Sequence, residues 1–481
     1  MSTSLNKNIF LTVIKTVASL AFPLITYPYI CRVLSPKGVG EFNYAQSIVS
    51  YFILLASLGV GTYAIREGAK IRDKKERYNI FASEIFSLNL FTTLLAYVVL
   101  FLCFGLFEEF RIHYKAILFF SIQILFETIG VNWIFATFED YLYITIRTIS
   151  FQLLSLVMLF VFVHEETDLY IYICIYVLST VGANIFNIIY SRIYFRFIPV
   201  KFKSIWKHFA PIFVIFSTIL ATVIYVNTDV IMLGWMKGTE QVGYYAVATK
   251  VYAVIKGTLN AIVPVFLARL SFEFENDKKM YLSELNYVFD LLTLFTVPIA
   301  VGALFFSDIT IIILSGEKYL TAKHSLQILL LSNFFATCGN ILCSGVLLQM
   351  RQEKKMLWAT TTGALINIAA NIYMIPKYGC SGAALTTLLT EVIVLSILGF
   401  YTWSIIKQLD YMHLIKCMMA TFPIIAIELI RKNIGYNGYS SQLISVILCA
   451  CSYFIMLFIL RDRIVLNCLK ILNKRVRKIY G

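Results

Sequence analysis

The stretch PYICRVLSPKGVGEFNYAQSIVSYF, from Pro28 to Phe52, places charged residues and two glycines between two long apolar segments. A related stretch, QVGYYAVATKVYAVI, runs from Gln241 to Ile255 in the second half of the chain. At one constant offset, Val39-Gly40, Phe42 and Ala45 match Val242-Gly243, Tyr245 and Ala248. The coincidence predicts an internal duplication, in which each glycine allows close packing where the chain enters a helix.

The composition around this stretch is that of a membrane protein. Hydrophobic residues make up 59% of the chain and charged residues only 14%, whereas a soluble domain carries about 25% charged residues. Many apolar runs exceed the roughly 10–14 residues of a buried core helix. Lipid satisfies no backbone polar group, and the alternation required by a β-barrel is absent, so the runs are expected to be helices.

The predicted fold is an all-α integral membrane protein with about 14 transmembrane helices. The expected spans are 9–31, 42–65, 83–106, 115–137, 142–163, 168–190, 209–233, 242–268, 285–306, 322–348, 357–375, 380–402, 412–430 and 441–460. The repeated stretches begin spans 2 and 8, so six helices separate them and both copies share one orientation. Parallel repeats predict two similar bundles with a substrate path between them. The expected domains are an N-lobe (1–208), a C-lobe (209–405), and spans 13–14 with a basic amphipathic tail (406–481).

Alternate loops differ sharply in charge. Basic residues concentrate in one set, including the loops 66–77, 192–207 and 269–279 and the C-terminal tail, whereas the opposite loops hold few. The positive-inside rule places the basic loops and both termini in the cytoplasm. The same distribution accounts for the net charge of +14 without a nucleic-acid partner, since no soluble basic domain is present.

The opening stretch, followed by LGVGTYAIREGAK from Leu58, resembles the start of the Wzx-type polysaccharide flippases of bacterial inner membranes. These belong to the multidrug/oligosaccharidyl-lipid/polysaccharide exporter superfamily. NWIFATFEDYLYITIRTISFQ from Asn132 and YGCSGAALTTLLTE from Tyr378 also resemble blocks of that family. Ser35 departs from the usual glycine, and Gly68 from the usual aliphatic residue. The resemblance implies a flippase for undecaprenyl-diphosphate-linked oligosaccharide in O-antigen or capsule synthesis, with membrane lipids, a polymerase and a chain-length regulator as partners.

Ionisable residues at membrane depth are costly and usually face a partner or a watery cavity. Lys15 and Lys250 belong to opposite lobes, and we expect them to form a cationic cavity for a phosphate-bearing substrate. Snorkelling of the long stems to the interface is the alternative. For Arg147 and Lys256, snorkelling and a place in the same cationic cavity are equally favoured. Arg32 and Arg66, at the two mouths, either guide substrate or anchor the helices at the interface.

The acidic residues at this depth are Glu127, Asp229, Asp290, Glu391 and Glu428. Asp229, Glu127 and Glu391 are candidates for binding a coupling proton or sodium ion. Asp229 could instead pair with Lys250 in the next span. Glu139 and Asp140 are expected to be solvated loop charges.

No Walker loop, metalloprotease motif or nucleophile elbow is present, so no cofactor or hydrolytic chemistry is indicated. The leading hypothesis is therefore a non-enzymatic flippase acting by alternating access. A cation-coupled multidrug exporter of the same superfamily is one alternative. A membrane-embedded polysaccharide polymerase or acyltransferase is another, but such an enzyme would carry large loops with clustered Arg or His.

Overall fold

The computed structural model describes residues 5–435 and 438–467, and all regular elements within these ranges are helices. The chain divides into two compact units, Met1–Gly243 and Tyr244–Gly481. The prediction of an all-helical membrane protein is confirmed. The lobe boundaries expected at residues 208 and 405 stay predictions. The predicted amphipathic tail lies outside the described residues beyond Asn467.

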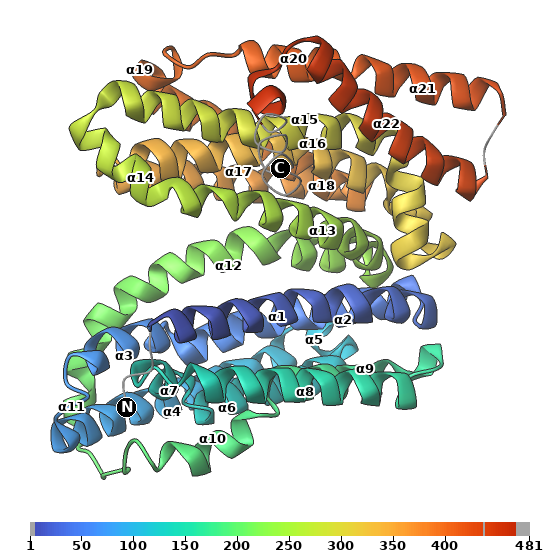
Figure 1. Ribbon diagram of the computed structural model, residues 1–481. Coiled ribbons are helices and arrows are strands. Elements are labelled where there is room, and N and C mark those ends of the chain that lie inside the picture. The colour runs from blue at the N-terminus through green and yellow to red at the C-terminus, as the bar shows by residue number, and fades with distance from the viewer. Residues whose placement is uncertain (1–4, 436–437, 468–481) are drawn as a thin grey trace, which may run out of the picture. The chain divides into compact units, whose positions relative to one another are not determined.

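The first unit is a bundle of long helices joined by short turns (Figure 1). Its α-helices are α1 (Leu5–Val33), α2 (Pro36–Ser57), α3 (Val60–Ala69), α4 (Lys75–Leu106), α5 (Glu108–Ile112), α6 (Tyr114–Ile129), α7 (Asn132–Thr137), α8 (Tyr141–Phe162), α9 (Leu169–Val181), α10 (Asn184–Ser191), α11 (Phe202–Ile205) and α12 (Phe209–Lys237). Two 3₁₀ turns, η1 (Glu166–Asp168) and η2 (Trp206–His208), connect them. Within the bundle α2 packs against α4, α6 and α12, while α1 packs against α8.

The opening stretch forms the turn between α1 and α2. Helix α2 begins at Pro36, six residues before the predicted span, because Ser35 caps it by accepting a hydrogen bond from the Gly38 amide (3.4 Å). Pro36 suits the first helical position, where no amide donor is needed. The helix then breaks at Leu58 and Gly59, both with positive φ (44° and 78°), before α3 continues.

The two repeated glycines lie at a close backbone approach inside the first unit. A Cβ on Gly40 would lie 1.6 Å from the Thr239 carbonyl oxygen, and one on Gly243 would lie 1.9 Å from the Pro36 carbonyl oxygen. Neither distance is possible for real atoms, so both positions require glycine. The expectation that these glycines permit close packing is confirmed.

The second unit begins within α13 (Thr239–Asn260). It continues through α14 (Ile262–Asn276), α15 (Lys278–Ser315), the 3₁₀ helix η3 (Glu317–Ala322), α16 (Lys323–Asn340), the π-helix η4 (Ile341–Leu347), α17 (Glu353–Tyr378), α18 (Cys380–Tyr401), α19 (Trp403–Ile406), α20 (Met412–Ala420), α21 (Phe422–Asn433) and α22 (Tyr439–Ile459). Helix α16 packs against α15 and α18, and α17 packs against α18. Helices α20 and α21 pack against α22 and α15.

Each predicted span falls on a helix or on a helix broken by a turn. Eleven helical segments of the described residues are long and apolar enough to cross a membrane. The predicted spans 115–137, 209–233 and 357–375 are not among these eleven, so the exact number of spans stays a prediction.

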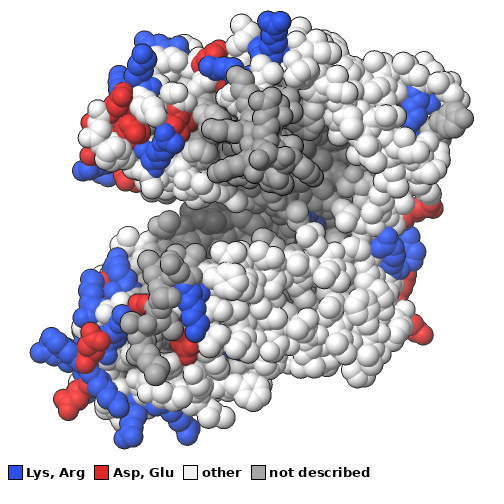
Figure 2. All heavy atoms as spheres, viewed as in Figure 1, with Lys and Arg blue, Asp and Glu red and all other residues white. Residues whose placement is uncertain are grey.

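The surface of the first unit supports the assignment of its long helices to the membrane. Figure 2 shows its Lys and Arg side chains gathered at one end, where α3, α4 and α11 lie in Figure 1. The face between its two ends is almost free of charged side chains in this view. An uncharged band of this kind is what contact with lipid requires.

Candidate functional site

Two broken helices create a polar cluster inside the first unit. Helix α6 ends at Ile129 and α7 resumes at Asn132, with Val131 at a positive φ of 39°. Helix α9 ends at Val181 and α10 resumes at Asn184. Such breaks free backbone carbonyls from their helical partners, and in a membrane protein other donors must replace those partners.

An asparagine amide supplies such a donor: Asn187 donates to the Gly130 carbonyl (2.7 Å), which the break leaves without a helical partner. The Asn184 amide donates to the Phe126 carbonyl (2.9 Å), which also keeps its helical bond from the Gly130 amide (2.9 Å). Gly130 leaves room for this arrangement, since a Cβ there would lie 2.4 Å from the Asn184 side-chain carbon. The breaks therefore hold several amide oxygens in a fixed position near one another.

Arg147 of α8 reaches these oxygens. Its guanidinium donates to the Asn132 side-chain oxygen (2.5 Å) and to that of Asn184 (3.5 Å). The rings of Phe135 and Tyr143 lie 5.5 and 5.4 Å from the guanidinium carbon. Its Nε is buried without a hydrogen-bond partner among the described residues. The hydrogen-bond partners of the Arg147 guanidinium are thus neutral groups, which do not themselves cancel its charge.

Glu127 and Lys15 complete the cluster. The Glu127 side chain is exposed and lines a cavity of about 230 Å³, together with Asn89, Thr128 and Asn132. Lys15 of α1 lies within electrostatic range of both Glu127 and Arg147. No described carboxylate forms a salt bridge with Lys15. The cluster therefore brings together three of the predicted site residues, with two cations for one carboxylate.

The other predicted residues of the first unit lie elsewhere. Arg32 is exposed and donates to the Pro28 carbonyl (2.8 Å), and Arg66 is exposed and pairs with Glu67 (2.9 Å). Asp229 is buried in α12, beside Thr228. Lys250 is half-buried in the second unit. A path shared by Lys15 and Lys250, and a pair between Asp229 and Lys250, stay predictions.

In the second unit, Lys256 and Glu391 form a direct ion pair at 3.1 Å. The lysine also donates to the Tyr252 hydroxyl (2.9 Å). A buried polar chain lies on the neighbouring helices, where Thr386 donates to Asn371 (2.5 Å) and Asn371 donates to Asn367 (3.1 Å). The sequence reasoning, which searched mainly for charges, overlooked Asn367 and Asn371.

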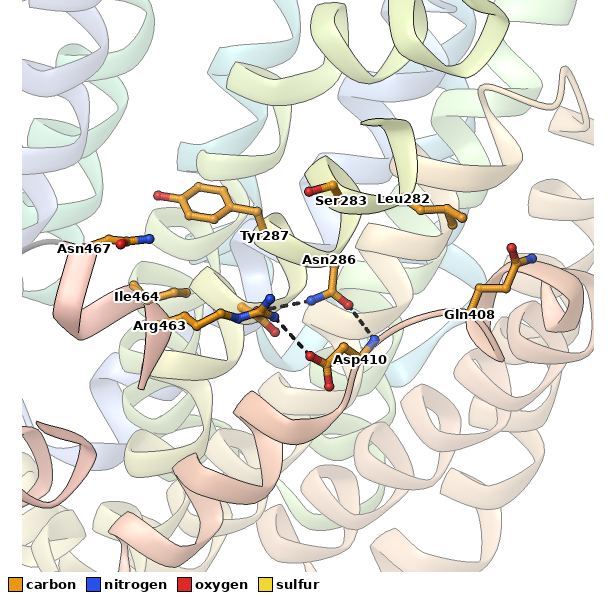
Figure 3. Close-up of a pocket in the computed structure, with 10 residues that line it drawn as sticks. Leu282, Ser283, Asn286, Tyr287, Gln408, Asp410, Arg463, Ile464 and Asn467 are labelled. Carbon is orange, nitrogen blue, oxygen red and sulfur yellow. Dashed lines mark hydrogen bonds and ion pairs between the residues drawn. The ribbon is translucent and has the colours of Figure 1, made fainter. Parts of the chain in front are cut away.

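The second unit also contains a polar cavity, of about 320 Å³ (Figure 3). Asn286 of α15 donates to buried Asp290 (3.2 Å) and accepts from the Asp410 amide (2.8 Å). The Arg463 guanidinium lies 3.1 Å from Asp410 and 3.8 Å from Asp290. The arginine ties the segment after α22 to α15, which gives Asp290 a structural partner.

One expectation for loop charges is wrong. Glu139 pairs with Arg72 (2.8 Å), while Asp140 caps α8 through the Tyr143 amide (3.2 Å) and accepts from the Tyr194 hydroxyl (2.7 Å). These carboxylates are not simply solvated, because their contacts link the turn between α7 and α8 to Arg72, to Tyr194 and to the start of α8.

Comparison with known proteins identifies a family and several relatives of this chain. Residues 5–271 match the family described as polysaccharide biosynthesis protein. A protein of Escherichia coli K12 named "Putative O-antigen transporter" is 23% identical over 82% of this chain and 96% of its own length. Its namesake in Shigella dysenteriae is 24% identical over 81% of this chain and 98% of its own length.

Among solved structures, the lipid II flippase MurJ in an inward closed conformation superposes with a TM-score of 0.75 at 17% identity, covering 95% of this chain and 100% of that one. This likeness concerns the fold. The resemblance to Wzx-type flippases is confirmed by the family match and the two relatives. Since the match spans more than half of the sequence, the chain belongs to the polysaccharide biosynthesis protein family.

Proposed function

We propose that this protein is a flippase that carries undecaprenyl-diphosphate-linked oligosaccharide across the bacterial cytoplasmic membrane for surface polysaccharide synthesis. The family membership and the O-antigen transporter relatives support the polysaccharide role. The fold shared with a lipid II flippase supports a lipid-linked cargo. Both termini would lie in the cytoplasm, and a polymerase and a chain-length regulator would use the exported unit.

The observation that carries the proposal is the charge of the cluster beside the 230 Å³ cavity. Arg147 is bonded to the neutral amides of Asn132 and Asn184, and Lys15 has no salt bridge to a described carboxylate. With Glu127 the formal sum is one positive charge. A diphosphate bears anionic oxygens that arginine and lysine bind through charge-assisted hydrogen bonds. Asn132 and Glu127 line the cavity itself and would contact the sugar hydroxyls.

The membrane potential would favour the outward direction. A diphosphate carries about two negative charges, and each is worth about 2.3 kcal/mol per 100 mV. Movement out of a negative interior therefore releases several kcal/mol. Lys250 would meet the same headgroup from the second unit, and Asp229, Glu127 or Glu391 would bind a proton or sodium ion if transport is coupled.

The test uses a strain whose surface polysaccharide depends on this protein. Lys15→Ala and Lys250→Ala, alone and combined, are compared with the unchanged chain at equal membrane expression. We expect the double variant to lower surface polymer at least tenfold, because both headgroup contacts are lost. Arg192→Ala is the control, since Arg192 is exposed at the end of α10 and belongs to no cluster described above.

A transport assay separates binding of the headgroup from other defects. Proteoliposomes would carry a fluorescent oligosaccharide on undecaprenyl diphosphate or on an uncharged polyprenol of the same length. We expect flipping of the diphosphate form alone. Equal flipping of both lipids, or normal polymer in the double variant, would show that the cationic site plays no part.

A further inference from the structure

A separate cavity of about 440 Å³ lies in the first unit, at the end opposite its basic loops. It shares no lining residue with the cavity beside Glu127. Six aromatic side chains dominate its wall, joined by two isoleucines and two carboxylates. The lining residues are Tyr44, Ile48, Tyr51, Phe52, Phe107, Glu108, Glu109, Phe110, Ile231 and Trp235.

The rings are held by packing on several helices. Phe110, in the short helix α5, meets Phe52 of α2 edge-on at 6.2 Å and lies 5.9 Å from Phe107. Tyr44 is buried against α12, where Gly234 makes room for it, because a Cβ at Gly234 would lie 2.3 Å from the tyrosine ring. Packing thus holds Tyr44 and Phe52 in place, whereas Phe107 and Trp235 are exposed at the cavity.

The charge at this cavity is negative. Glu108 and Glu109 line it, and no Lys or Arg is among its lining residues. His113 lies 3.9 Å from both Glu109 and Glu41, and its ring contacts Tyr44 edge-on at 5.1 Å. The chain therefore adds carboxylates rather than cations around the aromatic wall.

We propose that this cavity binds an organic cation through an ammonium group. Aromatic faces attract cations, and cages of aromatic rings with nearby carboxylates recognise primary or quaternary ammonium ions. The volume lies within the usual range for small-molecule sites, about 300–1,000 Å³. Two sources share this chemistry: the amine headgroup of phosphatidylethanolamine and a soluble amine such as an amino sugar. This inference stands independently of the proposed function.

The alternative explanation is that these rings only anchor the helices at the membrane interface, where Tyr and Trp are common. An interfacial anchor would not select positive charge. Comparing choline with its neutral carbon isostere, 3,3-dimethylbutan-1-ol, separates the two explanations because both molecules have the same shape.

The experiment measures binding of radiolabelled choline to the purified full chain in detergent, in competition with the neutral alcohol. We expect saturable choline binding and an at least tenfold weaker effect of the alcohol. Glu109→Gln should weaken choline binding at least fivefold. Glu76→Gln, a substitution of an exposed carboxylate at the start of α4, is the matched control. If Glu109→Gln fails to fold, the comparison of choline with the alcohol on the unchanged chain still shows whether the cavity selects a positive charge.

Competition then identifies the source of the amine. Nanodiscs containing phosphatidylethanolamine, compared with phosphatidylglycerol alone, test the lipid headgroup, while glucosamine compared with N-acetylglucosamine tests a soluble amine. Competition by either amine supports the proposal and names its source. Equal binding of choline and the alcohol, unchanged binding in Glu109→Gln, or no competition by either amine overturns it.

Discussion

Arg147 in the first unit and Lys256 in the second are both cations at membrane depth, but their surroundings differ. Arg147 donates to the neutral amides of Asn132 and Asn184, whereas Lys256 donates to the carboxylate of Glu391 (3.1 Å). Glu391 cancels the charge of Lys256, whereas Arg147 has neutral hydrogen-bond partners and shares the nearby Glu127 with Lys15. Neutral hydrogen-bond partners therefore allow a membrane protein to keep a half-buried cation available for an anionic ligand.

The largest expected effect is a loss of stability on breaking the Lys256–Glu391 ion pair of the second unit. Glu391→Gln leaves the half-buried Lys256 without its carboxylate, and breaking such a pair costs up to about 3 kcal/mol. We expect a clear fall in the thermal unfolding midpoint of the purified protein. The double variant Lys256→Met with Glu391→Met should recover most of the loss, because no charge is left unpaired.

Glu76→Gln serves as the control for loss of an exposed carboxylate. A Glu391→Gln variant that unfolds at the temperature of the unchanged chain would contradict the assignment of a structural pair. Lys256 would then resemble Arg147 as a cation available to ligand.

The first unit is tested by Arg147→Ala. This variant removes one of the two cations beside the cavity, and we expect flipping of the diphosphate lipid in proteoliposomes to slow at least tenfold. Arg147→Lys should restore only part of the rate, because a lysine cannot bond two amide oxygens in a fixed fork. If the alanine variant transports normally at equal reconstitution, Arg147 has a purely structural role.

A third substitution gives Arg147 a carboxylate partner, as Lys256 has in the second unit. Asn132→Asp places a carboxylate of nearly the same shape 2.5 Å from the Arg147 guanidinium. The cluster then loses its formal positive charge without losing packing. We expect flipping to slow about fivefold, near 1 kcal/mol at 1.4 kcal/mol per factor of ten. Faster transport would argue against a cationic site.

The fold was predictable because its spans are long apolar runs, and lipid permits little besides helix there. The helix breaks were not predictable. Val131 adopts a positive φ although it is β-branched, a conformation that only surrounding structure can impose. The pairing of Lys256 with Glu391 also depends on tertiary contact, since these residues lie far apart in the sequence.

The candidate site was predicted in part. Lys15, Glu127 and Arg147 were found because charges in apolar runs stand out. Asn184 and Asn187, whose amides help to position Arg147 and Asn132, were missed, because asparagine carries no charge and is easily overlooked in a helix. A usable signal did exist: Asn184 and Asn187 follow Gly182 in an apolar run, spaced to lie on one helical face.

Two histidine–carboxylate pairs give the smallest effect and extend the comparison to pH. Burial lowers the pKa of His208 in the first unit and outweighs the hydrogen bond with Glu84 (3.0 Å). In the second unit burial acts to raise the pKa of Asp462, but the hydrogen bond from His413 (2.6 Å) outweighs it and the pKa falls below its ordinary value.

Both shifts make the protein less stable as pH falls, but in different ranges. Because the pKa of His208 is lowered in the folded chain, the unfolded chain binds the proton more readily below about pH 6.5, and stability is lost from there downward. Asp462 contributes stability above about pH 3.9, which is lost only as pH falls through its lower folded pKa. From pH 7.5 to 6 the His208 effect amounts to about 0.8 kcal/mol at most.

Thermal unfolding of the unchanged chain and of His208→Gln across this range measures that effect. Glutamine can still bond Glu84 and the Tyr63 hydroxyl, which lies 2.9 Å from the histidine ring nitrogen, but it cannot take up a proton. Relative to this variant, we expect the unchanged chain to lose up to about 0.8 kcal/mol of stability as pH falls from 7.5 to 6. The same dependence on pH in both proteins would contradict the assignment of this effect to His208.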